Sequence, residues 1–121
     1  MPTNYRIDKT LGMIFSSASG VVTDDDLRGH QRAVLADPGF DPRFSQIWDF
    51  ERVEEVEVSS EALRALAESK SYSAESKRAV VAPHDVVYGM ARMFQMLHEE
   101  APEAFRVFRT PAEARAWLGL P

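Results

Sequence analysis

Apolar and polar residues alternate along the first part of the chain in the pattern of two neighbouring strands. Residues 4–8 follow the two-residue period of a half-buried strand. Residues 11–18 repeat that period and place Leu11, Met13 and Phe15 on one face. Because only antiparallel neighbours are joined by so short a connection, the two segments predict a β-hairpin.

Further along, short apolar runs alternate with amphipathic segments. The runs are typical of strands buried on both faces, and they cover residues 44–50, 78–82 and 105–108. The amphipathic segments predict four helices, with capping residues at Thr23, at Ser59 or Ser60, at Asp85 and at Thr110. The acidic stretch 51–58 is expected to be a loop. The order β-β-α-β-α-β-α-β-α predicts an α/β domain with about five strands, mostly parallel, and four helices.

Composition and charge narrow the class of protein. The chain has 121 residues, 45% of them hydrophobic, which suits a single domain over residues 1–121. It has no cysteine and no apolar stretch long enough to cross a membrane, so a cytoplasmic protein is expected, without membrane insertion. The net charge is −5 and the basic residues are dispersed, which argues against nucleic-acid binding. Arginine outnumbers lysine, a usage that suggests a bacterial source.

Three stretches, together with the order of elements, resemble the STAS-like superfamily, whose type case is the bacterial anti-sigma-factor antagonist. They are residues 47–50 with the polar loop up to Ser59, residues 88–95 and residues 107–119. The last two look most like a small bacterial STAS-like subfamily without an established activity. The resemblance implies a non-catalytic protein-interaction or regulatory module. It also implies a switch, because a serine at the start of the second helix is phosphorylated in the antagonist proteins.

Ser59 or Ser60 stands at the position of that serine. The flanking residues depart from the antagonist pattern, because Val58 replaces an aspartate and Glu61 replaces a glycine. A serine at this place is also an ordinary helix cap. The sequence therefore leaves a phosphorylation site and a structural cap as alternatives.

Two carboxylates mark a second candidate site. Asp49 ends the central strand and Asp85 precedes the long third helix, so the pair is expected on the rim of a pocket. The alternative is that Asp49 accepts loop amides and Asp85 caps its helix. His30 is expected on the core side of its helix and His84 in a loop. No catalytic triad, metal-binding pattern or cofactor motif is present, so neither catalysis nor a metal is expected.

The third helix carries the third candidate. Its core side is expected to hold five apolar residues, namely Val86, Met90, Met93, Phe94 and Leu97. Tyr88, Arg92 and Gln95 then fall on the outer side, with Met96 at the edge. Such residues favour protein interfaces, so a protein partner or a homodimer is one interpretation, and a solvated face is the other. A core rich in methionine and aromatic residues also suits a small apolar or anionic, lipid-like ligand, which is the alternative function.

Overall fold

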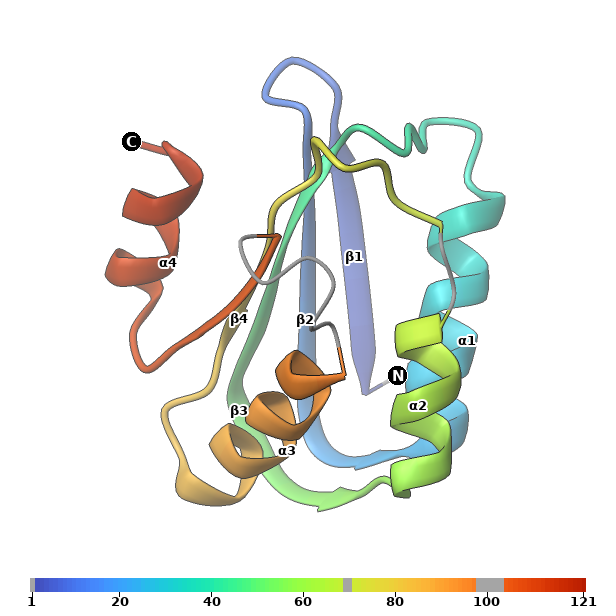
Figure 1. Cartoon of the computed structure of the whole chain (residues 1–121), viewed down its shortest axis with the longest axis vertical. Coiled ribbons are helices and arrows are strands. Elements are labelled where there is room, and N and C mark those ends of the chain that lie inside the picture. Colours follow the sequence, from blue (N-terminus) through green and yellow to red (C-terminus); the bar gives the residue numbers. More distant parts are fainter. Residues whose placement is uncertain (1, 69–70, 98–103) are drawn as a thin grey trace.

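The computed structural model describes residues 2–68, 71–97 and 104–121 of the chain. Figure 1 shows strands and helices in the predicted order. The elements are β1 (Thr3–Asp8), β2 (Met13–Thr23), α1 (Asp24–Ala36), β3 (Ser45–Glu57), α2 (Ser60–Glu68), β4 (Arg78–Val81), α3 (Asp85–Met96), β5 (Phe105–Phe108) and α4 (Pro111–Leu118). None of the helices in these ranges is long and apolar enough to cross a bilayer.

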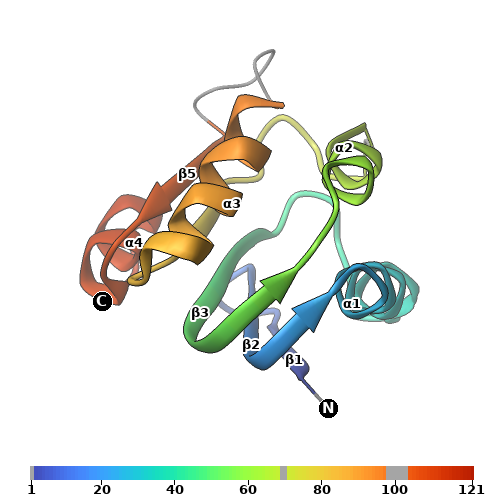
Figure 2. The same cartoon turned by 90° about the horizontal axis from the view of Figure 1, so that it is seen from below.

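The sheet has five strands in the order β1-β2-β3-β4-β5. The pair β1–β2 is antiparallel and the other pairs are parallel, as the sequence predicts. Successive side chains of a strand point to opposite faces, so the sheet carries two buried clusters. One cluster joins the sheet to α1, α2 and α3, and the other joins it to α4. Figure 2 shows α2 standing away from the sheet, where it packs mainly against α1 and α3.

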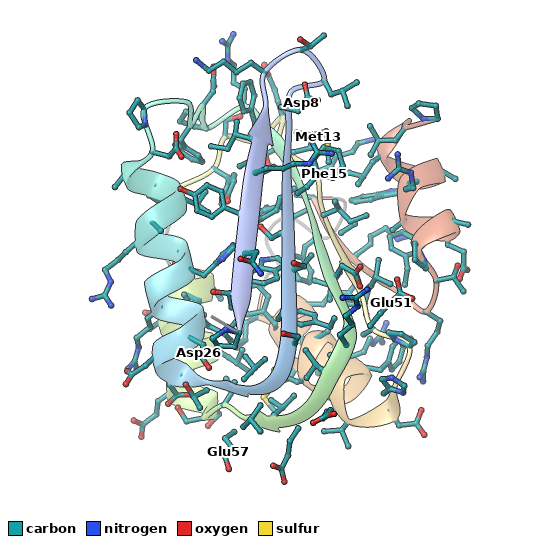
Figure 3. The ribbon with its side chains drawn as sticks, turned by 180° about the vertical axis from the view of Figure 1, so that it is seen from behind. Asp8, Met13, Phe15, Asp26, Glu51 and Glu57 are labelled. Carbon is teal, nitrogen blue, oxygen red and sulfur yellow. The ribbon has the colours of Figure 1, made fainter. Side chains whose placement is uncertain are left out.

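The acidic stretch is not a loop. β3 continues through it to Glu57 and pairs with the second half of β2 up to Thr23, across two irregularities in register. Val53 is buried and Val56 is half-buried, while the glutamates point outward, as Figure 3 shows for Glu51 and Glu57. The prediction was wrong because hydrogen bonding to a long neighbouring strand outweighs the low strand propensity of glutamate.

The expected core side of α3 is also partly wrong. The helix buries Val87 and Ala91, two residues that the periodicity did not select, and these small side chains let it lie close to the sheet. Met90 and Phe94 are partly buried, as expected. Three of the apolar residues expected in the core are exposed instead, namely Val86, Met93 and Leu97. The helix is apolar around more of its circumference than the sheet can cover.

Local signals at the ends of the other helices are confirmed. Thr23 forms a capping box with Asp26 at the start of α1. Thr110 accepts a hydrogen bond from the Glu113 amide at the start of α4, and Gly119 ends that helix with φ of 73°. These caps orient the helices that flank the sheet.

Candidate functional site

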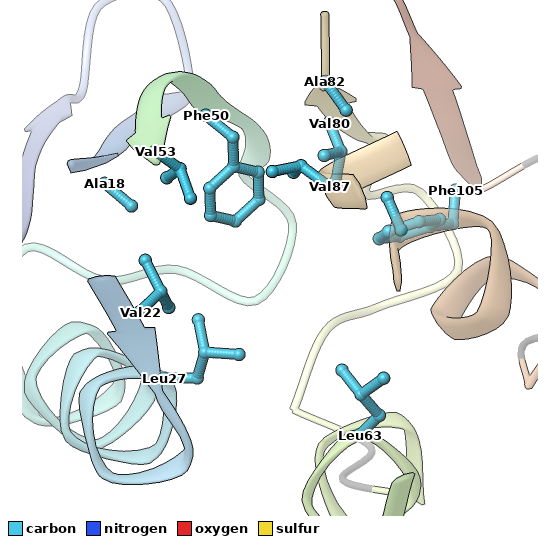
Figure 4. Close-up of a cluster of buried hydrophobic side chains, with 11 residues drawn as sticks. Ala18, Val22, Leu27, Phe50, Val53, Leu63, Val80, Ala82, Val87 and Phe105 are labelled. Atoms are coloured by element: carbon cyan, nitrogen blue, oxygen red, sulfur yellow. The ribbon is translucent and has the colours of Figure 1, made fainter. Parts of the chain in front are cut away.

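A pocket lies between the helix layer and the sheet, with α2 as its outer wall. Figure 4 shows part of it, with Leu27 of α1 and Leu63 of α2 facing Phe50 of β3 and Val80 of β4. The pocket has a volume of about 100 Å³ and is partly open to solvent. Its remaining lining residues are His30, Gln31, Val34, Gln46, Trp48, Leu66, Tyr72, Arg78, Met90, Ala91, Phe94 and Phe105. Most of these side chains are aromatic or aliphatic.

The polar groups of the pocket gather at the amino end of β3 and β4. Gln46 and Arg78 are opposite one another in the register of these strands. The Tyr72 hydroxyl donates to Oε1 of Gln46 at 3.1 Å, and the Arg78 guanidinium lies 4.9 Å from the centre of the Tyr72 ring. Burial raises the pKa of Tyr72 to about 12, so the phenol stays protonated and remains a donor.

A buried chain of hydrogen bonds runs from this end toward β2 and α1. Nε2 of Gln46 donates to Oγ of Ser16 at 2.9 Å, and the same oxygen lies 2.9 Å from Nε2 of His30. The His30 ring also packs on Trp48, with centroids 4.1 Å apart. Burial lowers the pKa of His30 to about 4, so the ring is neutral at physiological pH.

Arg78 is the one ionised side chain among the described lining residues, because His30 is neutral and no lining residue is Asp or Glu. Burial lowers the pKa of its guanidinium. Its Nε is buried and has no hydrogen-bond partner in the described part of the chain. The ion pairs formed by described residues belong to other arginines, namely Arg6, Arg43 and Arg109. The pocket therefore contains a partly desolvated positive charge that no carboxylate of the described residues balances.

The two predicted rim carboxylates do not line this pocket. Asp49 accepts the amide of Glu51 at 2.8 Å and lines a second, more open pocket of about 360 Å³ beside Arg115, to which Arg6 and Tyr5 also contribute. Asp85 is exposed and accepts a hydrogen bond from Arg109 at 2.9 Å instead of capping α3. Asp49 accepts a backbone amide as expected, but from Glu51 within strand β3 and not from a loop, and the capping interpretation of Asp85 is wrong. The first pocket lies toward the amino ends of β3 and β4, whereas the sequence predicted a pocket beyond the carboxyl end of the central strand.

Ser59 is a structural cap. Its Oγ accepts the amide of Ala62 at 3.1 Å and donates to Oδ2 of Asp24 at 2.8 Å, and its own amide donates to Oδ1 of Asp24 at 2.7 Å. These bonds lower the pKa of Asp24 and join the start of α2 to the start of α1. A phosphate on Ser59 would lie against the Asp24 carboxylate and repel it. Ser60 is the exposed first residue of α2.

The four residues predicted for an interface on α3 do not share one outer face. Arg92 and Met96 are exposed. Tyr88 is half-buried, packs against the core and is covered by the Arg109 guanidinium, 3.7 Å above its ring. Gln95 is half-buried and donates to the carbonyl of Phe105 at 3.4 Å. Tyr88 and Gln95 therefore stabilise the domain from within.

Sequence reasoning missed most polar residues of the pocket. Gln46 had one usable signal, because it shares a strand face with Trp48 and Phe50 at two-residue spacing. Arg78 was considered only as the start of a strand. His30 was correctly expected on the core side of α1, but nothing local connects it with Ser16. Within the described ranges, no three His, Cys, Asp or Glu side chains come together as a metal site would require.

Comparison with solved structures bears on the fold. A crystal structure of an uncharacterised DUF3478-family protein with a SpoIIAA-like fold, from Shewanella loihica PV-4, matches this chain with a TM-score of 0.58. The match covers 96% of this chain and 93% of that protein, at 16% sequence identity. The chain has a SpoIIAA-like fold. This finding confirms the STAS-like architecture expected from the sequence. No family model and no curated protein matches the chain.

Proposed function

We propose that this SpoIIAA-like domain binds a small, mainly apolar organic molecule in the pocket between α1, α2, α3 and the sheet. The observation that carries the proposal is the lining, which combines an aromatic and aliphatic wall with a few polar groups at one end. Ligand sites in proteins commonly have this composition. The position of α2 supports the proposal, because a helix held mainly by α1 and α3 leaves space above the sheet.

The volume of the pocket limits the size of the ligand. A cavity of about 150 Å³ with an apolar lining holds benzene, and this pocket offers about 100 Å³. Because the pocket is partly open, a ring-sized molecule can place most of its atoms inside and the remainder at the mouth. The ligand class is therefore a single small ring or a short aliphatic chain, rather than a long acyl chain.

A titration followed by NMR tests the proposal. Adding benzyl alcohol or benzoate to the intact chain is expected to shift the amide signals of pocket residues, with dissociation constants of roughly millimolar or tighter. Ala91→Leu fills the pocket from α3 and should weaken binding by about tenfold. Ala65→Leu adds the same atoms on the exposed side of α2 and should bind as the wild type does.

Leu66→Phe fills the pocket from the opposite wall, where Leu66 is only half-buried. It serves as a second test, because added bulk at the buried Ala91 also strains the core. Unmoved pocket signals in the folded wild type with both probes would contradict the proposal. Equal affinity in the wild type and both pocket-filling variants would contradict it as well.

A specific observation favours self-association as a second candidate function. The outer side of α3 exposes four apolar side chains, namely Val86, Met93, Met96 and Leu97. Gly89 lies among them with open space where a side chain would be. Two copies of α3 packed antiparallel about a two-fold axis would place Met93 of one copy against Gly89 of the other. Such a dimer is the non-catalytic interaction module implied by the STAS-like resemblance.

Light scattering over a range of protein concentrations tests the dimer. The wild type is expected to approach twice the monomer mass as concentration rises, and Met93→Glu should keep the chain monomeric because it places a charge at the centre of the contact. Ala33→Glu, at an exposed position of α1 outside the pocket, is a control with the same change of charge away from α3. A wild type that stays monomeric at high micromolar concentration would refute the dimer.

A further inference from the structure

We infer that the ligand carries an anionic group of the carboxylate class, held by Arg78 at the amino end of β3 and β4. This inference rests on the proposed function, because it assigns chemistry to one end of the same pocket. It identifies the bound molecule as a small organic acid, with the ring or chain against the apolar wall and the acid group toward the guanidinium.

The charge balance of the pocket supports an anion. Arg78 stands in a lining with no acidic side chain among its described residues, although the chain as a whole has a net charge of −5. Taking a cation partly out of water without a counter-charge is unfavourable. Proteins normally pair such a group with a carboxylate, and here Arg78 forms no ion pair with any described residue. A bound anion would supply the missing charge.

The geometry of the guanidinium supports a carboxylate in particular. Nε of Arg78 is buried and unsatisfied. That atom is closed to a ligand as it is to water, so a carboxylate would pair with the two terminal nitrogens, through the paired hydrogen bonds that arginine forms with planar anions. One guanidinium balances one negative charge, which suits a monoanion. The Tyr72 ring below the guanidinium, 4.9 Å from its centre, holds it in place for such a pair.

The neighbouring polar groups fit the same assignment. Gln46 is already bonded on both sides, accepting from Tyr72 and donating to Ser16. One N–H and the Oε1 of Gln46 are therefore bonded within the protein, and the Tyr72 hydroxyl donates its proton to Gln46. Arg78 is left as the main donor at this end. The pocket accordingly selects for an acid group and against a cation, which the guanidinium repels.

Paired isosteres test the inference. Benzoate and benzamide have nearly the same shape but differ in charge, so their affinities are compared by NMR titration at neutral pH. Wild type is expected to favour benzoate by about tenfold to a hundredfold, as hydrogen bonds to charged groups do. Arg78→Met should bring the ratio close to one, chiefly by lowering the affinity for benzoate. Arg78→Lys keeps the positive charge but loses the planar pair of N–H donors, so it should retain part of the preference for benzoate over benzamide.

Lys77→Met is the matched control. It removes the same charge from the adjacent residue, but Lys77 is exposed and lies over Trp117 of α4, on the other face of the sheet. The control should keep the benzoate preference of the wild type. Equal binding of acid and amide by the wild type would overturn the inference, and so would a preference that survives in Arg78→Met. In either case, pocket signals that move with both probes would still support the proposed function, whereas movement with neither would remove both.

Discussion

Lowering the pH from 6.5 to 4 is expected to lower the free energy of unfolding by about 3 kcal/mol, because a single side chain, His30, becomes protonated on unfolding. The imidazole is 5% exposed, lies against Trp48, and is bonded to Ser16. Protonation would place a charge where no carboxylate from β2, β3 or α1 is bonded to the ring. The folded protein therefore resists protonation at this position.

The direction follows from the two protonation equilibria. In the unfolded chain the pKa of His30 is 6.5, and in the folded protein burial lowers it to about 4. Between these values the unfolded state binds more protons, so acidification favours unfolding. The stabilisation is complete above pH 6.5 and is lost as the pH falls toward 4. At about 1.4 kcal/mol for each pH unit, the difference between the two pKa values corresponds to about 3.5 kcal/mol, most of which is lost by pH 4.

Urea denaturation at several pH values between 5 and 6.5 measures this effect. Three carboxylates with lowered pKa values titrate below this pH window and so do not contribute to the measured slope, namely Asp24, Asp37 and Asp41. His30→Gln keeps a polar partner for Ser16 and should flatten the pH dependence. His84→Gln replaces an exposed histidine that makes no side-chain cap bond, and it should leave the slope as in the wild type. An unchanged slope in His30→Gln would refute the assignment.

Parts of the fold that depend on local chemistry were predictable from the sequence. The cap at Thr110, the proline after it and the terminating Gly119 lie within ten residues of one another, and each acts on its own helix. The β1–β2 hairpin likewise follows from a short connection between two alternating segments. The extension of β3 to Glu57 was not predictable in this way, because it depends on pairing with Thr23 and its neighbours in β2.

The polar part of the pocket depends on contacts between distant residues. The bonds of Ser16 with His30 and with Gln46 span 14 and 30 residues, and that of Gln46 with Tyr72 spans 26. No periodic pattern marks such contacts, because each residue alone is unremarkable in its own element. The lack of a counter-charge for Arg78 in the described ranges is visible only when the walls of the pocket are assembled.

A difference between two paired isoleucines gives the second large expected effect. Ile14→Ala is expected to lower the free energy of unfolding by about 3–4 kcal/mol, and Ile7→Ala by only about 1–2 kcal/mol. The two residues are direct partners in the antiparallel pair β1–β2, so their side chains share one face of the sheet. Ile14 is fully buried, whereas Ile7, on the edge strand, is only half-buried. The same change of residue therefore leaves a cavity at Ile14 and a mostly solvent-filled space at Ile7.

Urea denaturation of both variants at neutral pH measures the difference, and Ile14→Val should cost about 1 kcal/mol as an intermediate step. Ile14 does not line the pocket, so Ile14→Ala should bind benzoate as tightly as the wild type under conditions where both are folded. Equal losses at the two positions would show that the β1–β2 edge is not packed as the structure has it. A loss of benzoate affinity in Ile14→Ala would show instead that the pocket depends on the packing of the edge strands, because a side chain outside its lining would then control ligand binding.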